Sequence, residues 1–310
     1  MNDTRRALLD ALAADEPTGP QLAERLGVSR AAVWKHVEEL REAGFAVDGN
    51  GGYRVTDVPE FGADAVAYGL DAPFDVEYHE RIDSTNRRAR ELAGEGESDV
   101  VVLANEQTGG RGRLDREWAS PSGGVWASLV LRPDLPPARV PLLTLAAAVA
   151  ITDAAREAGV DARIKWPNDV IVPEDDGYRK LAGVLTEMRG EADRVAWAVV
   201  GCGINVNVDG DALPPTATSV RAEAGDVSRR LFCQRVLERF AELRADPEGI
   251  VDAWRERADT LGREVRVTTD TETVVGEATD ITDGGALVVN TASGERTLHA
   301  GDCEHLRPAE

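Results

Sequence analysis

Apolar residues in the first part of the chain recur at helical spacing. Within residues 4–14 they fall three and four positions apart, which predicts an amphipathic helix. A second helix is expected over residues 21–26, ended by Gly27, and a third is capped by Ser29 and ended by Gly44. Two helices joined by a tight turn that contains glycine form the helix-turn-helix pattern.

The segment after these helices reads FAVDGNGGYRV, in which Asn50-Gly51 is a favoured hairpin turn. The hairpin predicts a winged helix over residues 1–58. The part of the third helix that would face the major groove of DNA holds Ser29, Arg30, Ala31, Trp34 and Lys35. This unit has seven Lys and Arg against ten Asp and Glu, so it lacks the basic character usual in DNA-binding domains. A small docking domain therefore stays the alternative.

Residues 61–261 alternate apolar runs of strand length with helical stretches, one of them a long apolar helix over residues 141–158. Strands are expected over residues 100–104, 125–131, 162–165, 170–172, 181–188 and 194–200. Their order favours a mixed, mostly antiparallel sheet and an α+β fold. Residues 262–310 hold short β runs between polar turns, which predicts a small barrel.

The 310 residues carry a formal net charge of −21, from 35 Lys and Arg against 56 Asp and Glu. This charge disfavours nucleic acid, and it would suit a salt-rich cytoplasm, in which case activity and structure should be lost at low salt. Three widely separated cysteines indicate neither a disulfide framework nor a zinc site. The longest apolar run, residues 141–151, is half of a membrane span, and the N-terminus has no signal-peptide pattern. We therefore expect a cytoplasmic protein with no membrane segment.

The central segment holds several polar clusters. Ser84-Thr85-Asn86 opens a helix, where plain capping is the alternative to a binding role. The loop from Gln107 to Arg113 joins glycines, which permit positive φ and close backbone approach, to guanidinium groups that suit phosphate or carboxylate oxygens. This loop is no dinucleotide fingerprint, because Asp115 stands where the third glycine would be.

Three more clusters lie at strand ends. Lys165 to Asp169 reads KWPND, Lys180 precedes an apolar strand in RKLAGVL, and Asn205 follows one in GCGINVN. A lysine at the mouth of a core strand is costly unless an anion is paired with it.

The motifs STN, QxxGRGR, W, SPxGGxxxS, KWPND, KLAGxLxE and GxGINVN stand here in the order found in the biotin protein ligase family, which the chain resembles over essentially its whole length. The winged helix and the terminal barrel are similar to those of the bifunctional class, whose members also repress biotin genes. The resemblance implies a catalytic domain of the class II synthetase type and an SH3-like C-terminal barrel. One departure is GRGRLDREW, where Asp115 replaces a glycine that is common in the family.

The resemblance also implies a two-step reaction. Biotin and Mg-ATP give biotinyl-5′-adenylate and pyrophosphate, and a lysine of a biotin carboxyl carrier protein then takes the biotin and releases AMP. By resemblance, the catalytic residues are Lys180, Arg111 and Arg113. Biotin would be bound by Ser84, Thr85, Asn86, Gln107, Gly110, Arg111, Gly112, Arg113 and Lys180, with apolar walls from Leu181, Ala182 and Val184. ATP and the adenylate would be bound by Arg113, Trp118, Lys165, Asn168, Asp169 and Asn205, with Asp169 also a ligand for Mg²⁺.

For the repressor, the resemblance implies a homodimer that forms when the adenylate is bound and contacts operator DNA. Three other interpretations stay open: a biotin sensor with a degenerate ligase site, a ligase whose winged helix does not bind DNA, and a lipoate ligase of the same catalytic fold. The GRGR loop, the helix-turn-helix and the terminal barrel argue against the last.

Overall fold

The computed structural model describes residues 3–191 and 193–306. Its N-terminal unit has the predicted winged-helix elements, which are α1 (Asp3–Ala14), α2 (Gly19–Leu26), α3 (Arg30–Glu42), β1 (Ala46–Asp48) and β2 (Arg54–Asp57). Gly27 takes a left-handed φ of 64° at the end of α2, and the Ser29 hydroxyl accepts a hydrogen bond from the Ala32 N–H at 3.1 Å. Both helix boundaries thus have the causes that the sequence predicts.

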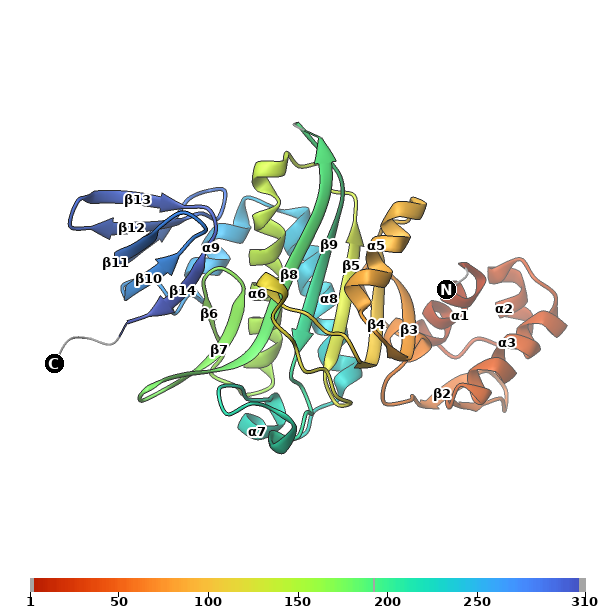
Figure 1. Ribbon diagram of the computed structural model, residues 1–310. Helices are drawn as coiled ribbons and strands as arrows, with labels where there is room; N and C mark the ends of the chain where they lie inside the picture. The colour runs from red at the N-terminus through yellow and green to blue at the C-terminus, as the bar shows by residue number, and fades with distance from the viewer. Residues whose placement is uncertain (1–2, 192, 307–310) are drawn as a thin grey trace.

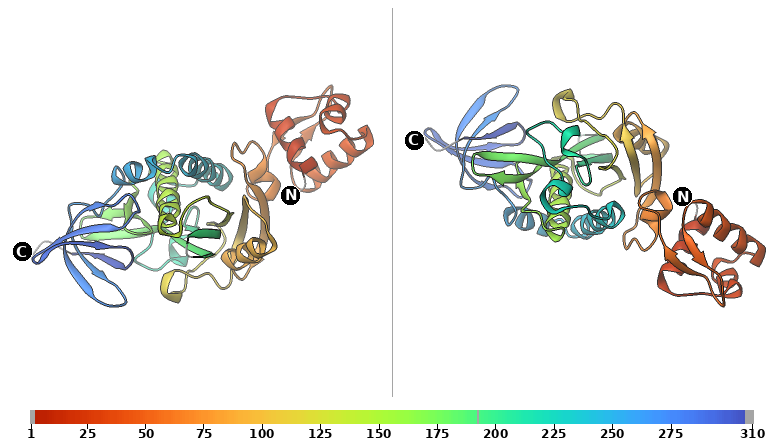
Figure 2. Two further views of the ribbon diagram at one scale, coloured as in Figure 1. Left: turned by 90° about the horizontal axis from the view of Figure 1, so that it is seen from above. Right: turned by 90° about the horizontal axis from the view of Figure 1, so that it is seen from below.

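Two arginines of α1 fasten this unit to the next part of the chain. Arg5 pairs with Asp64 of α4 (Ala63–Ala67) at 2.6 Å. Arg6 donates hydrogen bonds to three backbone carbonyls, those of Leu70, Ala72 and Phe74. The unit lies at one end of the elongated molecule, beside the outer strand of the central sheet (Figures 1 and 2).

The central sheet has seven strands in the order β3-β4-β5-β9-β8-β7-β6. These are β3 (Asp75–Ile82), β4 (Val100–Gln107), β5 (Val125–Leu131), β6 (Arg163–Lys165), β7 (Asp169–Glu174), β8 (Gly177–Glu191) and β9 (Arg194–Ile204). Only the β3–β4 pairing is parallel among them, which confirms the mixed, mostly antiparallel sheet. The charged edge strand β3 was not among the predicted strands.

Helices cover both faces of this sheet (Figures 1 and 2). α6 (Pro141–Glu157) packs on one face together with α8 (Arg229–Ala245) and α9 (Gly249–Arg255), around the main hydrophobic core. α5 (Thr85–Glu95) packs on the other face over β4, β5 and β9, with a smaller apolar cluster beneath it. The short α7 (Val220–Ala224) follows β9.

The long apolar helix predicted over residues 141–158 is α6, and most of its side chains are buried. One helical stretch, Pro137–Glu157, is long and apolar enough to cross a membrane by length and composition, with a mean hydropathy of 1.4. Of its most apolar window, 72% is buried inside the protein, and α6 supplies many of the residues of the main core. The burial assigns this helix to the core.

Five antiparallel strands form the C-terminal unit, in the order β13-β12-β11-β10-β14. They are β10 (Glu264–Thr268), β11 (Thr273–Ile281), β12 (Leu287–Thr291), β13 (Gly294–Leu298) and β14 (Asp302–His305). This sheet lies at the end of the molecule opposite to the winged helix (Figure 1). It contacts the KWPND segment directly, because the Trp166 indole N–H donates to the Gly285 carbonyl at 3.0 Å.

A buried polar chain strengthens this junction. The Trp166 backbone N–H donates to Thr260 Oγ1 at 2.9 Å, and Thr260 Oγ1 lies 3.0 Å from His305 Nε2. The other ring nitrogen of His305 lies 3.4 Å from the carboxylate of Asp259, which Arg263 also contacts at 3.0 Å. Burial raises the pKa of Asp259, but the hydrogen bonds from His305 and Arg263 outweigh it and hold this pKa below its usual 3.8.

Because the native pKa of Asp259 is lowered, its ionised form stabilises the fold above the ordinary aspartate pKa, and this contribution is lost as pH falls through the native value. We expect Asp259→Asn to lower the free energy of unfolding by about 1–3 kcal/mol at pH 7. The difference from wild type should be constant above about pH 5 and shrink below it. Urea unfolding from pH 3 to 7 measures this, with Glu295→Gln, an exposed position on β13, as the control. A difference that does not change with pH would contradict the assignment.

Candidate functional site

A single row of paired residues explains why distant segments meet. Across five strands the residues that stand opposite one another are Ala104, Trp126, Gly203, Gly183, Asp169 and, on the sixth strand, Lys165. The loop after β4, the KWPND turn, the start of β8 and the end of β9 therefore lie along one edge region of the sheet. The predicted site residues belong to these segments and to the start of α5.

Two glycines of the row make room for an aromatic side chain. A Cβ atom on Gly203 would lie 2.7 Å from Nε1 of Trp118, and one on Gly183 would lie 3.4 Å from the same ring and 3.2 Å from Cε of Lys180. The Trp118 indole therefore rests directly on the sheet, with Lys180 Nζ 5.0 Å from its ring centre. The glycines of the KLAG and GCG motifs thus serve close approach.

The loop between β4 and β5 is folded back on itself. The Gly112 N–H donates to the Arg116 carbonyl at 2.8 Å, and the Trp118 N–H donates to the Gly110 carbonyl at 3.0 Å. The loop glycines do not use the positive φ that glycine permits; the residue with positive φ in this loop is Leu114, with φ 55°. Close approach is confirmed, because a Cβ on Gly110 would lie 2.5 Å from the Trp118 carbonyl oxygen.

Arginines of this loop reach the KWPND turn and the C-terminal sheet. Arg113 donates to Asn168 Oδ1 and to the Gly301 carbonyl, both at 2.9 Å. Arg116 pairs with Asp302 at 2.6 Å; burial raises the pKa of this carboxyl, but the arginine outweighs burial and lowers it. Arg111 is exposed in this loop, and the side chain of Asp115 lies outside the described residues.

Two lysines share one carboxylate. Lys180 Nζ lies 2.7 Å from Asp169, and Lys165 Nζ lies 3.7 Å from the other oxygen of the same group. Lys165 is buried, with its ammonium 5.5 Å from the ring centre of Tyr178. The sequence predicts that Lys180 needs a paired anion, and Asp169 is that anion. Since Arg113 adds a third cation next to Asn168, the cluster keeps a positive excess suited to phosphate oxygens.

A second cluster lies at the start of α5. The backbone N–H of Thr85 donates to Gln107 Oε1 at 2.8 Å, and its hydroxyl lies 3.0 Å from the same oxygen. Gln107 Nε2 donates to Ser120 Oγ at 3.0 Å. Ser128, fully buried on β5, places its hydroxyl 2.8 Å from that of Thr85. Ser84 caps the helix, accepting from the Arg87 N–H at 3.4 Å, so the capping alternative holds for its hydroxyl.

Two buried polar atoms near Lys180 have no hydrogen-bond partner among the described residues, Nε1 of Trp118 and Oδ1 of Asn205. The Asn205 amide is oriented by its other end, since Nδ2 donates to the Thr218 carbonyl at 2.9 Å. Asn205 stands two residues after Gly203, which places it on the face where Trp118 lies. A buried donor and a buried acceptor without partners indicate a ligand with complementary groups.

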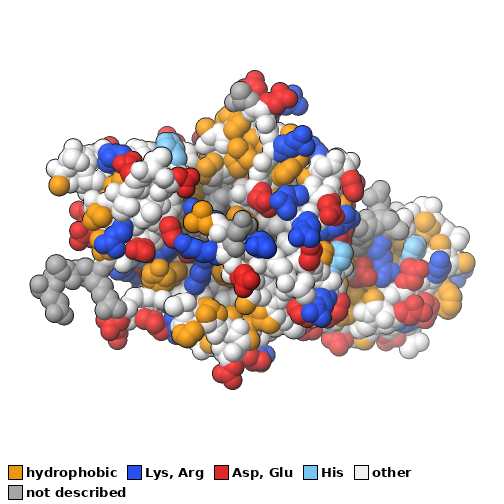
Figure 3. Space-filling view, viewed as in Figure 1, with side chains coloured by type: hydrophobic (Ala, Val, Ile, Leu, Met, Phe, Trp, Pro, Cys, Tyr) orange, Lys and Arg blue, Asp and Glu red, His pale blue; other side chains and the backbone are white. Residues whose placement is uncertain are grey.

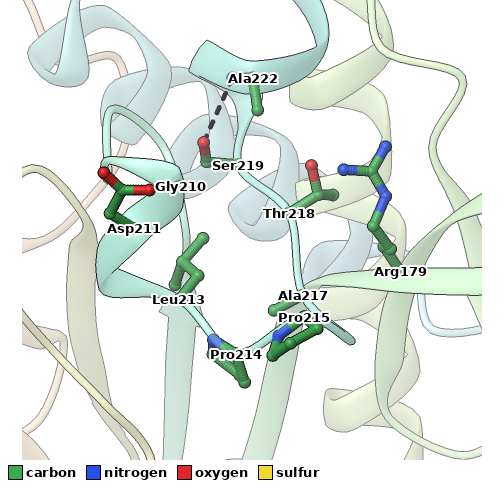
Figure 4. A pocket seen from close by; sticks show the side chains of 10 residues that line it. All are labelled: Arg179, Gly210, Asp211, Leu213, Pro214, Pro215, Ala217, Thr218, Ser219 and Ala222. Atoms are coloured by element: carbon green, nitrogen blue, oxygen red, sulfur yellow. Dashed lines mark hydrogen bonds between the residues drawn. The ribbon is translucent and has the colours of Figure 1, made fainter.

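The surface over these clusters is rich in Lys and Arg side chains, with acidic ones between them (Figure 3). A cavity of about 360 Å³ lies beside the first residues of β8, lined by Arg179, Leu213, Pro214, Thr218 and Ser219 among others (Figure 4). None of the predicted site residues lines it. Its rim touches the site through the backbone, because the Thr218 N–H donates to the Lys180 carbonyl at 3.0 Å.

The apolar walls were assigned to the wrong side of the sheet. Leu181, Ala182 and Val184 belong to the main core around α6, whereas Gly183 and Leu185 alternate with them toward the α5 face. Ser128 and Glu187 were missed as functional candidates although they stand in the SPxGGxxxS and KLAGxLxE motifs. The signal that could have identified Ser128 is its polar side chain within the otherwise apolar strand β5.

The described residues include no group of three or more His, Cys, Asp or Glu side chains that could hold a metal ion. The carboxylate of Asp169 is engaged by two lysines. A divalent ion would therefore bind here mainly through phosphate oxygens and water, as Mg²⁺ commonly does.

Comparison with known proteins agrees with this geometry. Residues 4–54 match the HTH domain, 78–205 the Biotin/lipoate A/B protein ligase family and 260–306 the Biotin protein ligase C terminal domain. The bifunctional ligase/repressor BirA of Bacillus subtilis is 37% identical over 306 residues, which cover 93% of each chain. The biotin–[acetyl-CoA-carboxylase] ligase of Paracoccus denitrificans is 38% identical over 72% of this chain and 97% of its own.

Among solved structures, the biotin protein ligase of Aquifex aeolicus in complex with biotin and ATP matches with a TM-score of 0.64 and 26% identity. The match covers 75% of the present chain and 99% of the Aquifex chain. The likeness to the bifunctional proteins extends over the winged helix as well as the central and C-terminal parts. The chain belongs to the biotin protein ligase family, in the class with an N-terminal helix-turn-helix domain.

Proposed function

We propose that this protein is an ATP-dependent biotin protein ligase that also represses transcription in response to biotin. The observation that carries the ligase function is the pair of buried atoms without partners, Trp118 Nε1 and Asn205 Oδ1, beside the cluster of Lys165, Asp169 and Lys180. Adenine offers both acceptors and donors to such atoms, and a triphosphate matches the cationic excess.

In the proposed first step, the biotin carboxylate attacks the α-phosphorus of ATP and pyrophosphate leaves. Lys180 neutralises the two anions that must meet, while Lys165 and Asn168 contact phosphate oxygens. Mg²⁺ bound with the phosphates would supply further positive charge, and Asp169, which pairs with two lysines here, is the predicted carboxylate that would reach it. Thr85 and Gln107 bind the ureido ring, which needs both donors and acceptors.

Arg111 and Arg113 of the β4–β5 loop act on the product of this step. The loop covers the adenylate and keeps water from the mixed anhydride. The glycines at 110 and 112 let the backbone pass close to biotin. In the second step the amine of a carrier-protein lysine attacks the biotinyl carbonyl, AMP leaves, and one proton is released.

We propose a biotin carboxyl carrier protein as the acceptor, which the name of the Paracoccus relative supports. The chain divides, in this proposal, into a winged helix over residues 1–58, a catalytic domain over 61–261 and a small β domain over 262–310.

The repressor function rests on the exposed face of α3. Ser29, Arg30, Ala31, Trp34 and Lys35 are all exposed, and Trp34 keeps 59% of its surface accessible although it is a large apolar side chain. An exposed aromatic between two cations suits a groove contact. We propose that the adenylate favours a homodimer, which places two such helices on operator half-sites.

The ligase test is transfer of labelled biotin to a biotin carboxyl carrier domain with Mg-ATP, at low and at molar salt. We expect Lys180→Ala and Arg111→Ala to lower the transfer rate at least about a hundredfold, because each removes charge stabilisation of the reacting groups. Arg296→Ala, an exposed position paired with Glu272 on the C-terminal sheet, should leave the rate unchanged.

Full transfer by Lys180→Ala would remove this residue from the site. Two other outcomes would contradict the ligase itself. Tight biotin binding by the wild type without adenylate formation would make the protein a sensor instead, and preference for lipoate in competition would make it a lipoate ligase.

The DNA test selects duplexes from a randomised pool in the presence of biotin and Mg-ATP, then measures binding by fluorescence anisotropy against salt. Lys35→Ala should weaken binding to the selected duplex and reduce the slope of log K against log salt by about one, because one phosphate contact is lost. Arg25→Ala, whose guanidinium on α2 is paired with Asp15, should not change the slope. No enrichment of any duplex would leave a ligase whose winged helix does not bind DNA.

A further inference from the structure

Lysine is almost missing from this chain. Only three of its 35 basic residues are lysines, namely Lys35, Lys165 and Lys180, and the others are arginines. The difference matters chemically, because a guanidinium group stays protonated, whereas a lysine amine can lose its proton and act as a nucleophile. An acyl compound that reacts with amines therefore has few side chains of this protein to attack.

Two of the three amines lie inside the site and share one carboxylate. Lys165 is 5% exposed, and its Nζ lies 3.7 Å from Asp169. Lys180 Nζ lies 2.7 Å from the other oxygen of Asp169 and 5.0 Å from the ring centre of Trp118. Thiols offer no alternative, since the three cysteines, all within the described residues, are buried. Acylation of the protein thus depends on the third lysine.

Lys35 is open to solution. Its side chain on α3 is 74% exposed, and its Nζ lies 3.7 Å from Glu39, one helical turn away. Glu39 also contacts His36 at 3.1 Å and Arg5 at 3.6 Å, so Lys35 is one of three partners of this carboxylate. Exposed ion pairs of this kind hold their side chains only weakly. Of the three lysine amines, that of Lys35 is the most accessible to a reagent.

We propose that Lys35 is a site of self-biotinylation, acylated by the adenylate that a second copy of this protein makes; the inference rests on the proposed ligase function. The neutral amine of Lys35 attacks the biotinyl carbonyl of biotinyl-5′-adenylate. The bond between this carbonyl carbon and the phosphate oxygen breaks, and AMP leaves with that oxygen. An amide forms, and the attacking nitrogen gives one proton to water.

The position of α3 explains why the donor is a second copy. The winged helix lies at one end of the molecule, beside the edge strand β3 (Figures 1 and 2). Lys165 and Lys180 lie on β6 and β8, beyond the strands β4, β5 and β9 in the order of the central sheet. The sheet therefore separates Lys35 from the site of its own chain, and the biotinyl group has to come from another molecule.

Acylation changes the face of α3 that the proposed repressor turns to DNA. Arg30 and Lys35 are the two cations of this face, and an amide at Lys35 removes one of the two charges. The biotinyl group also adds bulk beside the exposed Trp34. Biotin that is not passed to a carrier protein would thus weaken the contact with DNA.

The test incubates the full-length protein with biotin and Mg-ATP, without a carrier domain, and locates biotin by digestion and mass spectrometry. We expect biotin on the peptide that holds Lys35 and not on those of Lys165 and Lys180. Lys35→Arg keeps a positive charge but cannot be acylated, so it should lose the label. Transfer to a carrier domain, measured in a parallel sample, shows whether the adenylate is made.

A mixing experiment identifies the donor. The Lys180→Ala variant retains Lys35 but lacks charge stabilisation of the reacting groups, so it should stay unlabelled when incubated alone. Mixed with Lys35→Arg, it should acquire biotin on its Lys35. No label in this mixture, together with a labelled wild type, would overturn transfer between copies.

The same samples report on DNA by fluorescence anisotropy with the selected duplex. As Lys35 is acylated, the wild type should bind more weakly, and its slope of log K against log salt should fall by about one, because one phosphate contact is lost. Lys35→Arg should show no such change during the incubation. Labelled wild type that binds the duplex as before would overturn the effect on DNA.

Two results would overturn the modification site itself. One is label found mainly on Lys165, Lys180 or the N-terminal amine. The other is no label on a protein that transfers biotin to the carrier domain. In both cases the ligase function stands. A protein that labels neither itself nor the carrier domain would overturn the proposed function and this inference together.

Discussion

The site depends on side chains lying flat on a β-sheet, which is possible only where the sheet has no side chains of its own. Gly183, Gly201 and Gly203 provide this bare surface on the α5 face of two central strands. Trp118 rests on two of these positions and Asn86 on the third. A methyl group at 201 or 203 would stand within 3 Å of these side chains, so the loop and the helix start could not keep their places. Glycine weakens a strand, and here the two neighbouring strands, β5 and β8, hold β9 in place.

Charge balance is the second constraint. Lys165 is 5% exposed, and a buried ammonium is tolerated only with a partner. Asp169 serves as that partner while it also pairs with Lys180, so one carboxylate offsets two cations. The cluster is therefore left with more positive than negative charge. The buried position of Lys165 and the positive excess of the cluster, which the proposed function assigns to a polyanion, therefore have the same origin.

Much of this could be read from the sequence because the signals are local. Ser29 and Gly27 mark helix ends, and apolar runs mark β4, β5 and β9. The errors arise where tertiary contacts decide. The edge strand β3 is rich in charge and is held by its pairing with β4, and Ala182 and Val184 face the core because of a register that periodicity alone does not fix.

The contacts between the C-terminal sheet and the site join residues far apart in the sequence, so local patterns could not predict them. Arg113 and Arg116 of the loop reach Gly301 and Asp302, while Trp166 of the KWPND turn reaches Gly285. The loop and the turn, which also contact each other through Arg113 and Asn168, are thus fixed to one small domain at separate points. Each charge-assisted bond contributes only about 1.5–3 kcal/mol, so under the proposed function the loop would exchange these partners for the phosphate of an adenylate at modest cost. The C-terminal sheet therefore holds the arginines close to the cluster of Lys165, Asp169 and Lys180, from where the proposed function would have them move onto the substrate.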